Sequence, residues 1–268
     1  MTQSIPFHHP AWPCRALRRY ACIDILGAGG CGVVFRALDR LSGREVAIKL
    51  PHREAAAAGW TARARLLREA ETLRAARHHN VVALHAAGVV DGLVYLVMPI
   101  LDAAPLDARP LAWRAALAVG RQIGAALATV HSQGLVHRDV APRNILVAAS
   151  GRAWLIDFGL ARAMDPSRSQ VDDFAALALS GPGTGPGSPQ FAAPEQRRGE
   201  RVDGRADQYG LCATLLRGLA GSMPAGDRRA PLPDRLAAVL RRGMAEAPAH
   251  RFGDMRALVD ALAGCSAT

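Results

Sequence analysis

Short apolar runs broken by turn residues dominate the first hundred positions of the chain. Runs rich in Ile, Val and Leu predict five short strands, at residues 23–25, 33–35, 46–50, 81–87 and 93–98. Between the third and fourth runs the apolar spacing becomes helical, as at Leu66, Ala70 and Leu73, which predicts an amphipathic helix over residues 62–76. The turn at Asp91-Gly92 separates the last two strands, so this part of the chain is expected to form a small sheet with one helix.

After Pro99 the apolar positions follow helical spacing. Four amphipathic helices are predicted, at residues 111–131, 206–219, 232–244 and 255–262. Residues 164–189 are rich in Gly and Pro, and a loop of this length in a compact domain is usually functional or disordered. We therefore predict an α+β fold with an irregular leader over residues 1–19 and one domain over 20–263. Its sheet-rich part ends near residue 98, and its mainly helical part begins near residue 102.

The composition indicates which binding partners and which cellular compartment to expect. The net charge of +10 would suit a polyanion, but the arginines are scattered and have no aromatic residues among them, so no nucleic-acid surface is expected. Five cysteines without a CxxC pair favour a reducing cytosol over a disulfide framework or a zinc site. No apolar run approaches a membrane span and the first residues lack a signal-peptide core, so a soluble cytoplasmic protein is expected. The oligomeric state stays open.

Of the 33 Lys and Arg side chains, only one is a lysine, Lys49. A compact ammonium kept where every other cation is Arg suggests a point-charge contact that a guanidinium does not make, such as one to a phosphate. A rare residue can also fall anywhere by accident. However, Val46-Ala47-Ile48-Lys49 has the pattern of a buried strand ending on the cation, which favours a phosphate-facing lysine.

A glycine-rich turn, Gly27-Ala28-Gly29-Gly30-Cys31-Gly32, lies upstream of that strand. Glycines allow a sharp turn whose backbone N–H groups can close over phosphate oxygens. The same spacing also opens dinucleotide-binding folds, which require a helix directly after the last glycine. Here a strand-like Val33-Val34-Phe35 follows, so a hairpin flap is the favoured interpretation, with a purely structural hairpin as the alternative.

A buried lysine needs an anionic partner to stay charged. Glu69 and Glu71 both lie on the helix predicted over residues 62–76. Glu69 is the preferred partner of Lys49, and either glutamate could instead be a solvated surface carboxylate.

Three further side chains have the chemistry of a phosphoryl-transfer site. Asp139, in His137-Arg138-Asp139, can accept a hydroxyl proton, while Asn144 can offer an oxygen to a metal ion. Asp157, in Asp157-Phe158-Gly159, follows a predicted strand and offers a second metal ligand. A single loop Asp is usually a turn former, but the ordered set with strands between its members argues against that.

Together these motifs resemble the eukaryotic-type protein kinase family over about residues 20–263. The glycine turn, the strand ending at Lys49, the Asp139 and Asp157 motifs and Ala193-Pro194-Glu195 occur in the order that the family shows. Asp207 resembles the helix aspartate that anchors the catalytic loop, and Arg251 resembles the partner of Glu195. The Pro194-Glu195-Gln196 ending is most similar to bacterial Ser/Thr kinases. The resemblance implies a two-lobed fold with an antiparallel-sheet N-lobe and a helical C-lobe.

The resemblance also implies site residues for an ATP- and Mg²⁺-dependent kinase that phosphorylates Ser or Thr of proteins. Lys49, held by Glu69, would contact the ATP phosphates, Asp139 would be the base, and Asn144 and Asp157 would hold Mg²⁺. The remaining nucleotide contacts would come from the glycine turn and from residues around the adenine. These are Leu26, Gly27, Ala28, Gly29, Gly30, Cys31, Gly32, Val34, Ala47, Met98 as gatekeeper, Pro99 through its carbonyl, Leu101 through its N–H, and Leu146.

Two positions depart from the Ser/Thr kinase pattern. Ala141 stands where that class carries a lysine that reaches the transferred phosphoryl group, and Arg143 follows as in tyrosine kinases. Arg143 is expected to restore the missing charge. Ser188 stands where Ser/Thr kinases carry a hydroxyl that meets the catalytic aspartate, which favours Ser/Thr specificity. The alternatives are a tyrosine or dual-specificity kinase, a nucleotide-binding pseudokinase scaffold, and a small-molecule phosphotransferase.

Arg138 can pair with a phosphate on the loop over residues 164–189. Its candidate phosphorylation sites are Ser167, Ser169, Ser180 and Thr184. For each of them an unmodified loop hydroxyl is the favoured interpretation, and autophosphorylation of this loop is the alternative.

Overall fold

A computed structural model describes residues 17–29, 32–51, 60–90, 92–108, 111–164, 188–220 and 232–267. The chain divides into two compact units, one of Met1–Arg74 with Val82–Leu101, the other of Ala75–Val81 with Asp102–Thr268. The first contains the antiparallel sheet and the second most of the helices, so the predicted fold of a sheet-rich lobe and a helical lobe is confirmed.

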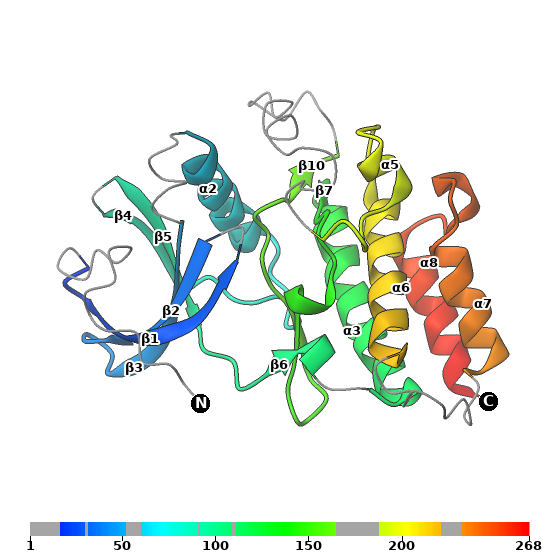
Figure 1. Ribbon diagram of the computed structural model, residues 1–268, viewed down its shortest axis with the longest axis horizontal. Helices are drawn as coiled ribbons and strands as arrows, with labels where there is room; N and C mark the ends of the chain where they lie inside the picture. The colour runs from blue at the N-terminus through cyan, green and yellow to red at the C-terminus, as the bar shows by residue number, and fades with distance from the viewer. Residues whose placement is uncertain are drawn as a thin grey trace. The chain divides into compact units, whose positions relative to one another are not determined.

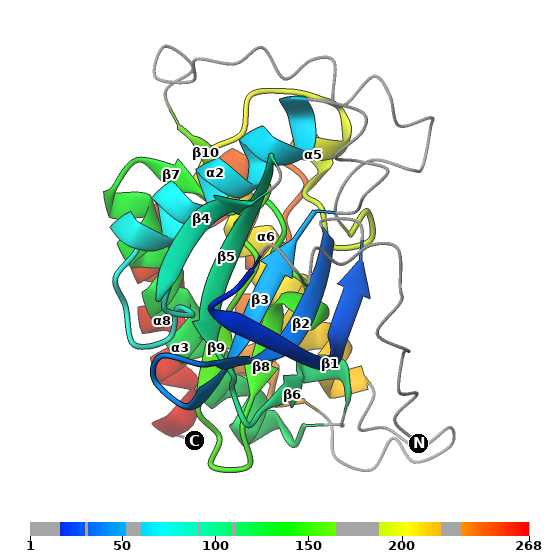
Figure 2. The ribbon, with the colours of Figure 1, turned by 90° about the vertical axis from the view of Figure 1, so that its left-hand side faces the viewer.

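The first unit is built on a five-stranded antiparallel sheet in the order β1-β2-β3-β5-β4. Its strands are β1 Tyr20–Gly29, β2 Gly32–Asp39, β3 Arg44–Leu50, β4 Ala86–Val90 and β5 Leu93–Pro99. Helix α2, Trp60–Ala75, lies across β4 and β5 in Figure 2. The helix predicted over residues 62–76 and the first three strands are therefore present.

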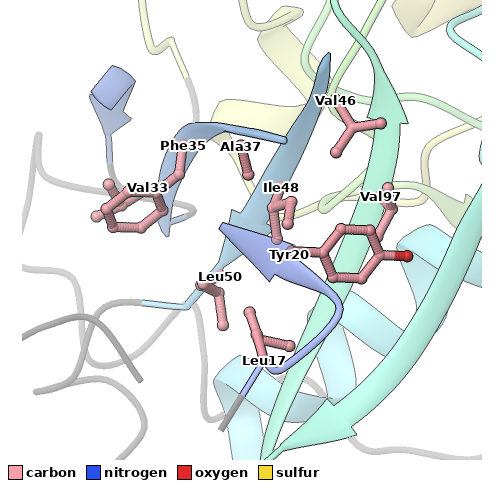
Figure 3. Packing of buried hydrophobic residues seen from close by; sticks show 9 residues of the cluster. All are labelled: Leu17, Tyr20, Val33, Phe35, Ala37, Val46, Ile48, Leu50 and Val97. Atoms are coloured by element: carbon pink, nitrogen blue, oxygen red, sulfur yellow. The ribbon is translucent and has the colours of Figure 1, made fainter. Parts of the chain in front are cut away.

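The pleat of the sheet separates two apolar faces, because successive side chains of a strand point to opposite sides. On one face Phe35, Ile48 and Val97 pack with Tyr20 and Leu17, as Figure 3 shows. Burial of each large apolar side chain in this cluster stabilises the fold by about 1.5–3 kcal/mol.

Helix α2 covers part of the opposite face. Its Leu66 and Ala70 pack against Val94 and Leu96 of β5. The helical spacing of apolar residues in the sequence is thus explained by a single line of contact with the sheet.

The residues from Leu17 to the start of β1 pack against the sheet and hydrogen-bond to it. Leu17 is buried, and the guanidinium of Arg19 donates to both carboxylate oxygens of Asp39 at 2.8 Å. This contact, with the Ser42 hydroxyl, holds the pKa of Asp39 well below its usual value. Of the leader expected over residues 1–19, residues 1–16 lie outside the described part of the chain.

The strand predicted over residues 81–87 is wrong. The strand is β4, Ala86–Val90, while Val81 makes only an isolated parallel bridge to Leu155 in the second unit. Val81 and Val82 are buried, so their apolar side chains reflect burial in the core and not membership of the sheet. A short apolar run does not distinguish the two.

In the second unit α3 packs against α6 and α8, and α7 packs against the same two helices (Figure 1). Their bounds are α3 Trp113–Ser132, α5 Pro194–Arg197, α6 Gly204–Ala220, α7 Asp234–Gly243 and α8 Met255–Ala263. The four long helices confirm the four predicted from the sequence. Gly120 and Gly124 allow close approach, because a Cβ there would lie 2.6 Å from Leu215 of α6 and 2.5 Å from Val259 of α8.

Short strands complete the second unit beside the helices. They are β6 Ala104–Pro105, β7 Leu135–Val136, β8 Ile145–Val147, β9 Ala153–Leu155 and β10 Arg162–Ala163. Only β8 and β9 carry an apolar run long enough to be predicted. Among the described residues, no helix combines the length and apolarity that crossing a bilayer requires. Residues 165–187 of the Gly/Pro-rich segment lie outside the described part, together with its four candidate phosphorylation sites.

Candidate active site

Lys49 and Glu69 form a buried ion pair within the first unit. The ammonium nitrogen lies 2.8 and 2.9 Å from the two carboxylate oxygens, and the residues are 5% and 1% exposed. Lys49 is on β3 opposite Leu96, on the sheet face that α2 covers, which places Glu69 of α2 within reach. Glu71 is exposed. The predicted pairing with Glu69 is confirmed, and removing either charge would leave the other buried without its partner.

The glycine-rich segment forms a strand pair and not a strand–helix turn. Gly29 of β1 lies opposite Gly32 of β2, and β2 continues from there as a strand, so the predicted hairpin is confirmed. Gly32 has φ 134°, and a Cβ at this position would meet the carbonyl oxygen of Leu50, so only glycine fits. Gly30 and Cys31 lie outside the described residues.

Three of the residues expected around adenine share one face of the sheet. Ala47 lies opposite Met98, and Val34 lies opposite Lys49. Residues opposite each other in an antiparallel pair point to the same side. The face that carries Lys49 therefore also carries Val34, Ala47 and Met98.

The other expected nucleotide contacts lie on elements of both units. Leu26 is 48% exposed on β1, Pro99 ends β5 opposite Val46, and Leu101 follows in the same unit. Leu146 lies on β8 of the second unit.

Asp139 is 5% exposed, and three hydrogen bonds reach its carboxylate. Its Oδ2 accepts from Arg143 and from the Asn144 amide, both at 2.8 Å, and its Oδ1 accepts from the Ser188 N–H at 3.0 Å. Its carbonyl accepts a second bond from the same Asn144 amide at 2.8 Å. The loop therefore brings Asp139, Arg143 and Asn144 together. Ser188 contacts Asp139 through its backbone N–H and not through the hydroxyl considered in the sequence analysis.

Asp207, on α6, fixes the backbone just before Asp139. Its carboxylate accepts from the N–H of His137 at 2.9 Å, from the N–H of Arg138 at 2.8 Å, and contacts Nε2 of His131 at 2.7 Å. Burial alone would raise the pKa of Asp207, but the hydrogen bonds and charges of His131 and His137 outweigh it and hold the pKa below its usual value. The anchoring geometry that the resemblance implied is thus present.

Asn144 and Asp157 flank two paired strands of the second unit, β8 and β9. Asn144 precedes β8, Asp157 lies two residues beyond β9, and the Ile156 N–H bonds to the Asn144 carbonyl at 2.9 Å. The Asn144 amide nitrogen is used by Asp139, which leaves the amide oxygen as its ligand atom. An amide and a carboxylate oxygen are ligands that Mg²⁺ accepts when phosphates and water complete its shell, so these residues fit the ion. No cluster of three His, Cys, Asp or Glu suited to a metal occurs among the described residues.

Glu195 and Arg251 form a second buried ion pair. The guanidinium donates to both carboxylate oxygens, at 2.7 and 2.8 Å. It also donates to three backbone carbonyls, those of Ala245, Arg205 and Glu246. Arg251 thereby links α5 to the first turn of α6 and to the segment that follows α7.

Sequence reasoning missed two polar side chains of this region. His131, in the last turn of α3, contacts Asp207, and Gln196, on α5, donates to the carbonyl of Arg138 at 2.9 Å. Gln196 entered the sequence analysis only as part of Pro194-Glu195-Gln196, and His131 belongs to none of the motifs named there. The spacing of His131 from His137 and the position of Gln196 after Glu195 were the only signals available.

A family model described as "Protein kinase domain" matches residues 20–238. The chain belongs to the protein kinase family. The predicted family and enzyme class are therefore confirmed.

Two curated proteins similar to this kinase domain are bacterial serine/threonine kinases. It is 35% identical to serine/threonine-protein kinase PknD of Mycobacterium tuberculosis over 260 residues, covering 87% of this chain and 37% of the relative. PknE of the same organism is 34% identical over 269 residues, covering 90% of this chain and 46% of the relative. The chain thus spans less than half the length of these two relatives.

The PknI kinase domain of Mycobacterium tuberculosis, solved as a crystal structure of a double mutant, has a similar fold. The TM-score is 0.70 at 28% identity, and the match covers 93% of this chain and 96% of that one. The kinase domain thus resembles a bacterial kinase over nearly its whole length.

Proposed function

We propose that this domain transfers the γ-phosphoryl group of ATP, with Mg²⁺, to serine or threonine hydroxyls of proteins. The observation that carries the proposal is the placement of Asp139. It is a buried carboxylate whose two oxygens are held by Arg143, Asn144 and the Ser188 N–H. Phosphoryl transfer depends mainly on positioning and charge, and this carboxylate is oriented before substrate arrives.

Each group then has a defined task. Asp139 orients the acceptor hydroxyl and takes its proton. Lys49, aimed by Glu69, contacts phosphate oxygens of the nucleotide, and Val34, Ala47 and Met98 on the same sheet face supply apolar contacts. Mg²⁺ bound by Asn144 and Asp157 would neutralise phosphate charge.

Arg143 supplies the positive charge that Ala141 lacks. Ala141 is fully buried, whereas the Arg143 side chain is 51% exposed while its guanidinium touches Asp139 at 2.8 Å. A cation at this point is placed to stabilise charge that develops on the phosphoryl group. Losing one such contact typically raises the barrier by about 2.7–4 kcal/mol.

The test is incubation of the purified chain with labelled ATP, Mg²⁺ and a mixture of Ser-, Thr- and Tyr-containing peptides. We expect label on Ser and Thr after acid hydrolysis, and none with Lys49→Met or Asp139→Asn. Arg143→Ala should reduce kcat by about a hundredfold or more, and Arg143→Lys should recover part of it.

Three results would overturn parts of this proposal. Label mainly on Tyr would assign a tyrosine kinase. Nucleotide binding without transfer by the wild type would assign a pseudokinase. Wild-type turnover by Asp139→Asn would show that Asp139 is not the base.

A further inference from the structure

Arg138, directly before the proposed base, has a backbone conformation that a side chain disfavours. Its φ is 68°, in the left-handed region, where a non-glycine residue persists only if its surroundings fix it. The conformation of Arg138 sets the direction of the peptide that leads into Asp139. What holds Arg138 therefore also orients the Asp139 carboxylate.

Two side chains hold Arg138, one on each of its peptide groups. On the preceding peptide, the Arg138 N–H donates to Oδ1 of Asp207 at 2.8 Å. On the following peptide, the Arg138 carbonyl accepts from Nε2 of Gln196 at 2.9 Å. The N–H of that second peptide, which belongs to Asp139, reaches only Nδ1 of His137, at 3.3 Å. Gln196 thus supplies the shorter of the two contacts to the peptide that carries Asp139.

The position of Gln196 is fixed by a hydrogen bond of its own side chain and by the ion pair of its neighbour Glu195. Its Oε1 accepts from the Ala193 N–H at 3.3 Å, which satisfies a free donor at the start of α5. The next residue toward the N-terminus is Glu195, locked to Arg251 by two bonds. The amide nitrogen therefore projects toward Arg138 from a short helix that the ion pair anchors.

An amide is required for both contacts together. It accepts at one atom and donates at the other, whereas an ionised carboxylate only accepts and a thioether does neither well. Gln196→Glu should keep the bond from Ala193 and lose the bond to Arg138, placing two acceptors against each other.

We infer that Gln196 is a positioning residue for phosphoryl transfer, which clamps the strained Arg138–Asp139 peptide and so aims the catalytic carboxylate. The inference rests on the proposed phosphotransfer. It adds to it a link between α5 and the loop that carries Asp139.

Gln208 offers a matched control within the same unit. Its amide also bridges a backbone N–H and a carbonyl, both of Phe252 and both at 3.1 Å, and its side chain is fully buried. Gln208→Glu makes the same chemical change in a more buried place without touching Arg138. It should cost more stability than Gln196→Glu and less activity.

The experiment compares the intact chain with Gln196→Glu, Gln196→Met and Gln208→Glu, measuring kcat, KM for ATP and the urea midpoint. We expect Gln196→Glu to lower kcat about tenfold or more, since small misplacements of reacting groups are costly. KM for ATP should stay within about twofold, because the Lys49 contacts are unchanged. Gln196→Met should lose activity as well as stability. Gln208→Glu should lower the urea midpoint. Below that midpoint its kcat should equal that of the wild type.

Hydrogen exchange of residues 136–140 gives a readout that does not need activity. Amides of this segment should exchange faster in Gln196→Glu than in wild type and at the wild-type rate in Gln208→Glu. Wild-type kcat and exchange in Gln196→Glu would overturn the inference, as would an equal loss of kcat in Gln208→Glu. A wild type without transfer would defeat the proposed function, while exchange would still decide whether Gln196 holds the loop.

Discussion

Replacing Arg251 tests whether the ion pair with Glu195 holds the second unit together. Glu195 and Arg251 are 3% and 2% exposed, and the guanidinium satisfies both carboxylate oxygens and three backbone carbonyls. Arg251→Met keeps much of the aliphatic volume but leaves a buried carboxylate without its partner. Breaking a buried pair from one side in this way costs about 3–5 kcal/mol.

The opposite change should cost less. In Glu195→Gln the guanidinium keeps its three carbonyl acceptors and can still donate to the amide oxygen, so the loss should be about 1.5–3 kcal/mol. In the double variant neither charge is left unpaired. Its cost should fall short of the sum of the single costs by about 1–3 kcal/mol.

Urea unfolding of the wild type and the three variants, followed by circular dichroism, measures these differences through the midpoint at constant slope. Arg198 provides the control, because its ion pairs with Glu200 and Glu246 lie on the surface. Arg198→Met should leave the midpoint close to that of the wild type. If Arg251→Met loses less than about 1 kcal/mol, or if the two single costs simply add, the pair does not stabilise the unit as argued.

Three further outcomes are expected. Glu69→Gln should lower kcat/KM for ATP at least about tenfold, because Lys49 loses its charged partner, whereas Glu71→Gln on the exposed side of α2 should leave the kinetics unchanged. The lowered pKa of Asp207 adds stability above the usual carboxyl pKa of about 4, and this contribution is lost as pH falls through the lowered value. In acid titrations of the urea midpoint, Asp207→Asn should therefore show a flatter dependence than the wild type, and an unchanged profile would contradict the assignment. Burial raises the pKa of the Cys212 thiol to about 12, so iodoacetamide at pH 8 should leave Cys212 unmodified in the native protein and modify it in urea, as peptide mass spectrometry would show.

The sequence predicted those parts of the site whose residue type carries the chemistry. Lys49 stands out as the single lysine of the chain, and Asp139, Asn144 and Asp157 stand out as an ordered set with strands between its members. The ion pair of Lys49 with Glu69 followed from the need of a buried cation for an anion. The long helices followed from apolar spacing alone.

The parts that could not be predicted depend on contacts between distant segments. The apolar run at Val81 correctly indicated buried residues, but the strand predicted from it was wrong. Val81 forms a bridge to Leu155, 74 positions further along the chain, and a local pattern does not show such a contact. His131 contacts the Asp207 side chain, and Gln196 donates to the Arg138 carbonyl. Neither contact follows from the position of the residue in the sequence. Tertiary placement decides such roles.

Two residues of the kinase motifs, Arg138 and Asp157, have a strained backbone conformation. Among the described non-glycine residues, positive φ occurs at Arg138 and Asp157, next to the proposed base and at a proposed metal ligand. Each such residue costs about 1–3 kcal/mol and persists only where neighbouring contacts outweigh the cost. At Arg138 those contacts are the Asp207 carboxylate and the Gln196 amide, and at Asp157 they include the Gly159 N–H, which donates to Oδ1 at 3.2 Å. Relaxing the two turns at Arg138 and Asp157 would stabilise the chain. Their strained conformations therefore argue that these turns orient Asp139 and Asp157, and do not merely connect strands and helices.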